Sequence, residues 1–209
     1  MISALEALER LRAGNRRFAS GGWKRDTFMS QAKRNELVEG QEPIATILGC
    51  SDSRAPVEII FDQGPGDLFV IRVAGNIVSP SQVGSVEYAA ERSGSRLVVV
   101  LGHSHCGAVQ ATIDELKRPT ADQSPNLRAI VGRIKPSVET LFDTDLKNDP
   151  VALYRHAIRA NVRASAGHLR HGSAIIEHQI EHGGLLIVGA VYSLETGIVD
   201  FFDGVPEGA

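Results

Sequence analysis

The sequence contains little of several residue types, and each shortage excludes a class of protein. Only two of its 209 residues are cysteines, too few for a disulfide-rich secreted scaffold. The longest apolar runs, such as Leu97–Leu101 and Leu185–Val191, fall well short of the ~20 residues that a membrane-spanning helix needs. Lys and Arg total 22 against 25 Asp and Glu, so no basic excess indicates a nucleic-acid partner. We therefore expect a cytoplasmic protein with neither a membrane nor a nucleic-acid partner.

The sequence does contain short runs of strand-forming residues that alternate with helical patterns. Four runs are apolar almost throughout, as expected for strands buried on both faces of a sheet: Ile44–Leu48, Leu68–Val73, Arg96–Leu101 and Leu185–Val191. This alternation predicts an α/β fold with a central, mostly parallel β-sheet flanked by helices. We expect one domain over residues 1–209, with an N-terminal helical arm over 1–40 and an α/β core over 41–209.

The segments around these runs give helix signals. The N-terminal stretch MISALEALERLRAGNRRF has the apolar spacing of an amphipathic helix and lacks the apolar core of a signal peptide. The stretch GAVQATIDELK predicts a helix that begins near Gly107 and stops at Pro119. Residues 124–182 indicate several helices, with interruptions at Pro136 and Pro150. The last segment, AVYSLETGIVDFF, predicts a closing strand and turn.

Two of the predicted strands lead into residues that can bind a metal ion. The run Ile44–Leu48 continues to Cys50, and Arg96–Leu101 continues into GHSHCGAV, which contains His103 and Cys106. If both strands are parallel, the three side chains lie just beyond the carboxyl ends of the strands. Open α/β sheets build their sites at this edge. Both cysteines of the chain would then meet at one place.

Two thiolates and one imidazole are a ligand set suited to zinc. Structural zinc sites normally have four Cys or His ligands, whereas three protein ligands leave a fourth position open, which is the catalytic pattern. Spacing alone leaves the alternative of two core cysteines and a loop histidine without a metal, because cysteine is often a small buried residue. Asp52 and Arg54 follow Cys50 directly. They favour the metal site, because a core thiol needs no adjacent ion pair.

The motifs CSDSR and GHSHCGAV together resemble the β-class carbonic anhydrases. The similarity extends through FDQGPGDLFVIRVAGNIV and GSVEYAA, and weakly to GAVYSLETG. The resemblance implies that Cys50, His103 and Cys106 bind one Zn²⁺ per chain. It also implies that Asp52 and Arg54 form a catalytic dyad beside the metal, with Asp52 as a possible fourth ligand in a closed state.

The resemblance further implies reversible hydration of carbon dioxide to bicarbonate and a proton, by attack of zinc-bound hydroxide. Gln41, Phe69 and Tyr88 match the residues that line the substrate pocket in the plant-like, open-site branch of the family. In the family these residues come partly from the neighbouring subunit. We therefore expect a homo-oligomer built from dimers, with the N-terminal helices packed on a partner subunit.

Another branch of the family is inhibited by bicarbonate bound to a Trp, an Arg and a Tyr. Arg72 and Tyr192 match that pocket, but Ile47 occupies the position of the Trp. An aliphatic side chain supplies no indole N–H, so we do not expect this mode of regulation. An open site at neutral to basic pH is the expectation for this chain.

Two alternative functions use the same residues. One is hydrolysis of CS₂ or COS on the same zinc site, and the other is a structural or redox-sensing zinc protein with a closed site. A separate motif, HQIEH, places His178 and His182 at the spacing of a zinc-peptidase pattern. It lies at the end of its predicted helix and has no third ligand, so we interpret it as a solvated helix end.

Overall fold

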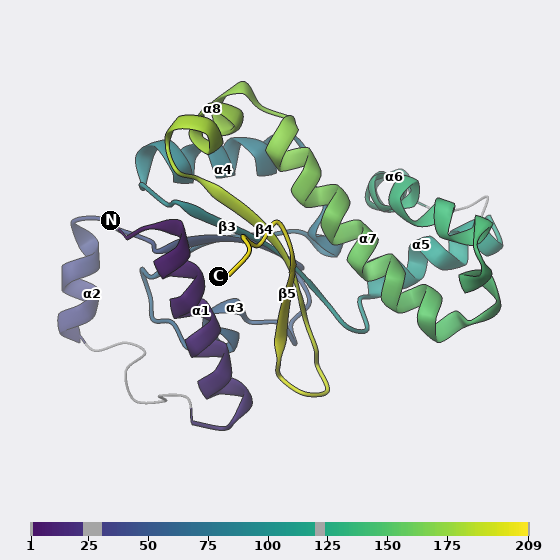
Figure 1. The fold of residues 1–209 in the computed structure, drawn as a ribbon, viewed down its shortest axis with the longest axis horizontal. Coiled ribbons are helices and arrows are strands. Elements are labelled where there is room, and N and C mark those ends of the chain that lie inside the picture. The colour runs from purple at the N-terminus through teal and green to yellow at the C-terminus, as the bar shows by residue number, and fades with distance from the viewer. Residues whose placement is uncertain (1, 23–30, 120–123, 209) are drawn as a thin grey trace.

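A five-stranded sheet forms the centre of the computed structural model, which describes residues 2–22, 31–119 and 124–208 (Figure 1). The strands are β1 (Ala45–Gly49), β2 (Leu68–Arg72), β3 (Leu97–His103), β4 (Leu186–Tyr192) and β5 (Val199–Asp203). Their order in the sheet is β2-β1-β3-β4-β5, and only β5 pairs antiparallel with its neighbour. The predicted, mostly parallel sheet and its closing strand are therefore confirmed.

Helices cover both faces of the sheet. They are α1 (Ala4–Ala19), α2 (Gln31–Val38), α3 (Val57–Ile60), α4 (Pro80–Arg92), α5 (Gly107–Lys117), α6 (Pro125–Glu139), α7 (Pro150–His171) and α8 (Ala174–His182). The helices α1 and α3 pack on one face, and α4, α7 and α8 pack on the other (Figure 1). A third cluster joins α5, α6 and the first half of α7 around Cys50 and Cys106.

Burial on both faces explains why the strand sequences are apolar almost without interruption. In β1, Ile47 packs in the cluster that α1 and α3 form with one face of the sheet. The next residue, Leu48, packs against α4 and α7 on the other face. All seven residues of β3 are buried. Successive side chains of a strand point to opposite faces, so a strand covered on both sides needs apolar residues at every position.

The first helix packs on its own chain. Leu8 and Leu11 are fully buried in the same cluster as β1, and the side-chain amide of Asn15 donates hydrogen bonds to the carbonyls of Ile60 and Gly197. Our expectation that the N-terminal helices pack on a partner subunit stays a prediction. The helix α2 is mostly exposed. Residues 23–30 of the predicted arm lie outside the described residues.

Proline affects the helices differently from the sequence prediction. Pro150 begins α7 as its first residue, where its missing N–H costs nothing, and Asp149 caps the same end. Pro136, in contrast, lies inside α6 and does not interrupt it. The carbonyl that loses its donor belongs to Gly132, and both residues are exposed, so water can replace the lost hydrogen bond.

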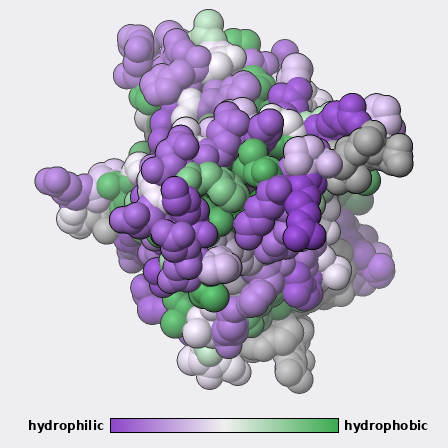
Figure 2. Space-filling model, turned by 90° about the vertical axis from the view of Figure 1, so that its right-hand side faces the viewer, coloured by the Kyte–Doolittle hydropathy of each residue, from purple (hydrophilic) through white to green (hydrophobic). Residues whose placement is uncertain are grey.

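The surface beside the third cluster is polar. Figure 2 looks at the molecule from the side of α5 and α6 and shows hydrophilic residues over most of that face, with hydrophobic residues in small, separate groups. Within the described part of the chain, no helix combines the length and hydrophobicity required to cross a membrane.

Candidate active site

The three predicted ligand residues come together at one edge of the sheet. The strands β1 and β3 are parallel neighbours, so Cys50, directly after β1, lies close to His103, the last residue of β3. Cys106 caps the start of α5 a few residues later. The potential ligand atoms of the three residues all lie within 4.8 Å of one another, and all three residues are buried. The predicted convergence is confirmed, although His103 belongs to the strand rather than to the loop beyond it.

His103 is oriented as a metal ligand. Its Nδ1–H donates to the carbonyl of Ser104 at 2.8 Å, which leaves the lone pair of Nε2 directed into the cluster. This Nε2 atom is buried and has no hydrogen-bond partner. A buried acceptor without a partner costs free energy unless it binds something. Metal-binding histidines typically use their second ring nitrogen for such a hydrogen bond to a carbonyl.

The two thiols perturb each other and favour a cation. A hydrogen bond from the Cys106 thiol lowers the pKa of Cys50, and the proximity of Cys50 raises the pKa of Cys106. The backbone N–H of Gly75 also donates to Cys50 Sγ at 3.2 Å, which stabilises negative charge on that sulfur. The cluster therefore holds a thiolate ready for a metal ion.

The donor set fits zinc in number, type and spacing. Zinc binds sulfur at about 2.3 Å and imidazole nitrogen at about 2.0 Å in tetrahedral sites, which places ligand atoms about 3.5–3.8 Å apart. Donors that all lie within 4.8 Å of one another need only a small contraction to reach this spacing. Three protein ligands leave one tetrahedral position for another group.

Asp52 and Arg54 form a bidentate ion pair beside this cluster. Arg54 Nε–H donates to Asp52 Oδ1 at 2.9 Å, and Nη2–H donates to Oδ2 at 2.8 Å. These hydrogen bonds hold the pKa of Asp52 well below its usual range, so the carboxylate is ionised. Asp52 Oδ2 lies 3.8 Å from His103 Nε2. The carboxylate is thus adjacent to the ligand atoms but turned toward Arg54.

Arg72 holds the backbone that carries these residues. From the end of β2, its Nε–H donates to the carbonyl of Cys50 at 2.9 Å, and its Nη2–H donates to the carbonyl of Asp52. The guanidinium matched to the inhibitory bicarbonate pocket is therefore engaged with the ligand loop. Tyr192 and Ile47 are buried in the cluster below α1. Our expectation that the chain lacks this mode of regulation stays a prediction.

The predicted substrate residues lie apart from the cluster of their own chain. Gln41 precedes β1 and Cys50 follows it, so a five-residue strand, about 16 Å long, separates them. Phe69 pairs with Thr46 in the first half of the strands, and its ring lies 6.1 Å from that of Tyr88. Because the Tyr88 side chain is exposed, these residues form a surface and not part of the chain's own ligand cluster.

Several polar contacts of the site have no signal in the sequence. Tyr154, on α7, donates its hydroxyl to the carbonyl of Cys106 at 2.9 Å. Glu195, in the turn between β4 and β5, accepts hydrogen bonds from Ser104 and His105. No local sequence pattern predicts these hydrogen bonds, because each one joins residues that are far apart in the sequence. The imidazole of His105 is exposed and contacts Glu195 Oε1 at 2.6 Å.

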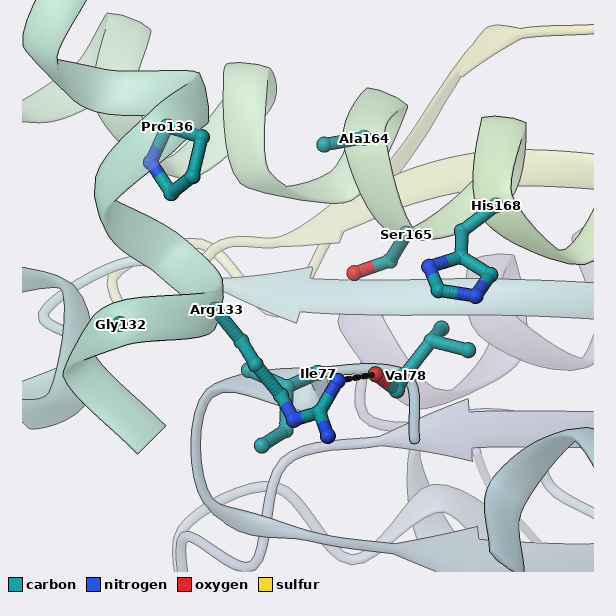
Figure 3. A pocket seen from close by; sticks show the side chains of 8 residues that line it. All are labelled: Ile77, Val78, Gly132, Arg133, Pro136, Ala164, Ser165 and His168. Carbon is teal, nitrogen blue, oxygen red and sulfur yellow. Dashed lines mark hydrogen bonds between the residues drawn. The ribbon is translucent and has the colours of Figure 1, made fainter. Parts of the chain in front are cut away.

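Other histidines and a nearby cavity do not form the site. The rings of His178 and His182 stack at 4.7 Å on the last turns of α8, and among the described residues only Cys50, His103 and Cys106 form a potential metal-binding group. A cavity of about 280 Å³ lies between α6 and α7, where Arg133 donates to the carbonyl of Val78 (Figure 3). It includes none of the ligand residues, so ligand chemistry and not concavity locates the site.

Comparisons with known proteins agree with this geometry. A family model described as "Carbonic anhydrase" matches residues 45–199. Carbonic anhydrase 2 of Mycobacterium tuberculosis (strain CDC 1551 / Oshkosh) is 38% identical over 193 residues, which cover 91% of this chain and 89% of that protein. The carbonic anhydrase of Mycolicibacterium smegmatis is 36% identical over 196 residues, which cover 93% and 91%.

Solved structures share the fold. One of two tetrameric β-carbonic anhydrases from Sordaria macrospora matches with a TM-score of 0.71 and 27% identity, covering 81% of this chain and 85% of that one. The β-carbonic anhydrase CcaA matches with a TM-score of 0.72 and 26% identity, covering 97% and 91%. The family match spans both ligand motifs, and the shared fold places them at one sheet edge. On this evidence the chain belongs to the β-class carbonic anhydrase family.

Proposed function

We propose that this chain hydrates carbon dioxide reversibly to bicarbonate and a proton, at a zinc ion held by Cys50, His103 and Cys106. The observation that carries the proposal is the convergence of three buried donors, one of them an unpartnered imidazole nitrogen, beside an ionised carboxylate. Zinc, when bound, lowers the pKa of water so that hydroxide is available near neutral pH.

Asp52 orients the nucleophile in this proposal. An ionised carboxylate only accepts hydrogen bonds, so it binds the O–H of the nucleophile and leaves an oxygen lone pair free for the carbon of CO₂. Arg54 keeps Asp52 ionised and holds both of its oxygens. Without that hold, Asp52 Oδ2, only 3.8 Å from His103 Nε2, can turn toward the ligand cluster and block the fourth position. The observed ion pair supports the open, plant-like arrangement.

A partner subunit completes the site in this proposal. The predicted substrate residues are distant from the ligand cluster of their own chain: Gln41 precedes β1, Phe69 is in β2 and Tyr88 is on α4. The strand β2 forms an edge of the sheet, and Tyr88 is exposed, so a second copy can dock there. A similar solved structure is described as tetrameric. We therefore propose a homo-oligomer built from dimers, in which these residues bind substrate. We also propose that neither nucleic acid nor membrane is a partner, which is supported by the lack of a basic excess and of long apolar runs in the sequence.

Two broader proposals concern the chain as a whole. A single domain over residues 1–209 is supported by the shared core, because Leu8 and Leu11 of the N-terminal arm pack in the same cluster as β1. A cytoplasmic location is supported by the need to keep Cys50 and Cys106 reduced for zinc, since a reducing compartment prevents a disulfide between them.

The test is the rate of CO₂ hydration by zinc-quantified protein across pH 6 to 9, measured by stopped flow with a pH indicator. We expect turnover that rises with pH at one zinc per chain, and loss of turnover with zinc retained in Asp52→Ala. No turnover in the zinc-loaded parent would contradict the proposal, and assays with CS₂ and COS would then follow. Full turnover in a Cys106→Ser variant that binds no zinc would contradict the ligand assignment.

A further inference from the structure

The loop between β3 and α5 sets the separation of His103 and Cys106. Only Ser104 and His105 lie between these two ligand residues. His105 has a φ of 55°, in the left-handed region that costs a non-glycine residue about 1–2 kcal/mol. A conformation of this kind persists only where the surroundings hold it.

Glu195 contacts both residues of the loop with its two carboxylate oxygens. Ser104 Oγ–H donates to Glu195 Oε2 at 2.8 Å, and His105 Nε2–H donates to Oε1 at 2.6 Å. Charge-assisted hydrogen bonds of this kind are stronger than neutral ones. They hold the pKa of Glu195 at about 2, well below its usual range, with Ser104 as the largest cause.

The turn that carries Glu195 is itself well anchored. Ser193 Oγ–H donates to Glu195 Oε2 at 2.9 Å, and the N–H of Leu194 donates to Ser104 Oγ at 2.9 Å. Asn15, on α1, accepts from the N–H of Val199 and donates to the carbonyl of Gly197, which ties the part of the turn after Glu195 to the N-terminal helix. Glu195 therefore extends from a fixed support.

The same loop also reaches the catalytic dyad. Arg54 Nη2–H donates to the carbonyl of His105 at 3.0 Å, in addition to its bond with Asp52. His105 is thus held at its ring by Glu195 and at its carbonyl by Arg54. A shift of the loop would change the position of Cys106 and remove a hydrogen-bond acceptor of Arg54 at the same time.

We propose that Glu195 is a positioning residue for the metal site: its carboxylate holds Ser104 and His105 and so fixes the separation of His103 and Cys106. The inference rests on the zinc site proposed above. The carboxylate of Glu195 bonds to Ser104, His105 and Ser193 and not to a ligand side chain, so its effect passes through the loop. Loss of residues that orient metal ligands typically lowers metal affinity or activity about 10–100-fold.

The test compares Glu195→Ala, Glu195→Gln and a control, Glu181→Ala. Glu181 is also an exposed glutamate near a histidine, 3.8 Å from His182, but it lies on α8. Two readouts need no turnover: the visible spectrum of the cobalt-substituted protein, which reports ligand geometry, and the rate at which a chelator removes zinc. We expect zinc release about 10-fold faster and altered cobalt bands in Glu195→Ala. Glu195→Gln should be intermediate, and the control should match the parent.

A second background makes the test specific. In Ser104→Ala/His105→Ala the two side chains of the loop no longer donate to the carboxylate, so adding Glu195→Ala should change neither readout further. The proposal is overturned if Glu195→Ala leaves the cobalt spectrum and the zinc release rate unchanged. It is also overturned if the Glu195 effect persists fully in the double variant, or if the parent binds neither metal. A parent that binds zinc but does not hydrate CO₂ would refute the proposed function and leave this inference standing.

Discussion

The position of Gly75 requires a positive φ and leaves no room for a side chain, and only glycine meets both requirements. Replacing Gly75 by alanine is therefore the most direct stability test of the site. Its φ is 71°, and its N–H donates to Cys50 Sγ at 3.2 Å. A Cβ atom added there would lie 2.8 Å from Ile134 Cδ1 and 3.1 Å from Ala108 Cβ. Both the backbone conformation and the packing therefore oppose a side chain.

The magnitude follows from these two costs. A left-handed conformation costs an alanine about 1–2 kcal/mol. Overpacking of a core by one methyl group costs about 1–3 kcal/mol. The smaller entropy of the unfolded alanine chain returns about 0.4–1 kcal/mol. We therefore expect Gly75→Ala to lower the free energy of unfolding by about 1–4.5 kcal/mol, a large part of the ~5–15 kcal/mol that holds a typical domain folded.

Urea denaturation of the metal-free protein measures this change. With a slope of about 2 kcal/mol per molar urea, in the middle of the usual range, the midpoint should fall by about 0.5–2 M. Gly132→Ala is the matched control, because a Cβ atom there has no neighbour within 4 Å and the residue lies inside α6. In a helix interior, replacing glycine by alanine should stabilise the protein by about 0.5–1 kcal/mol.

The same substitution should also weaken zinc binding. The backbone shift that relieves the clash moves the N–H of Gly75 away from Cys50 Sγ, which removes a hydrogen bond to the ligand thiolate. Chelator competition should then show lower zinc affinity in Gly75→Ala and parental affinity in Gly132→Ala. A Gly75→Ala protein with the parent's urea midpoint would refute the reasoning on both packing and backbone.

Three other predictions concern the ion pair and the metal. Arg54→Ala should lower kcat for CO₂ hydration about 100-fold or more with zinc content unchanged. Arg54→Lys should recover little activity, because lysine lacks the bidentate geometry. Stopped-flow rates near the parent's would contradict this prediction. Removal of zinc by a chelator should lower the midpoint of thermal unfolding, and re-addition of zinc should restore it, because the metal binds only the folded arrangement of thiolates. An unchanged midpoint would argue against a zinc site at Cys50, His103 and Cys106. Asp52 has a folded pKa below its unfolded value of about 3.9, so its contribution to stability is present above that pH and is lost as the pH falls toward the folded value. Urea unfolding of metal-free Asp52→Asn between pH 2 and 5 should therefore show a weaker loss of stability on acidification than the parent does.

The strands and the ligand cluster could be predicted because each has a local cause. Continuous apolar runs arise from burial on both faces, and all four of them became strands. Neighbouring parallel strands end at the same sheet edge, so Cys50 and His103 had to approach each other once the sheet was parallel. These inferences needed only the order of residues and the geometry of a sheet.

The misses have a different origin. Glu195 meets His105 across 90 positions of the sequence, and no periodicity connects a turn after β4 to a loop after β3. The spacing of Leu8 and Leu11 predicted a buried face on α1, which is confirmed, but no spacing says which element that face contacts. Pro136 was expected to stop a helix because its cost was weighed without its surroundings. On an exposed turn of α6, water can serve the carbonyl that proline leaves without a donor.

The hydrogen bonds divide the site into parts that can fail separately. Arg72 holds the carbonyls of Cys50 and Asp52, so the ligand loop after β1 keeps its backbone even when Arg54 is removed. Arg54 holds the carboxylate of Asp52, and that side chain is the part of the loop that can turn. Loss of Arg54 should therefore stop catalysis without releasing the metal, whereas loss of Glu195 should loosen the metal through the other loop. Arg54 also donates to the carbonyl of His105, but Arg72 holds the backbone of one ligand loop and Glu195 holds the side chains of the other. We therefore expect metal retention and turnover to depend mainly on different side chains.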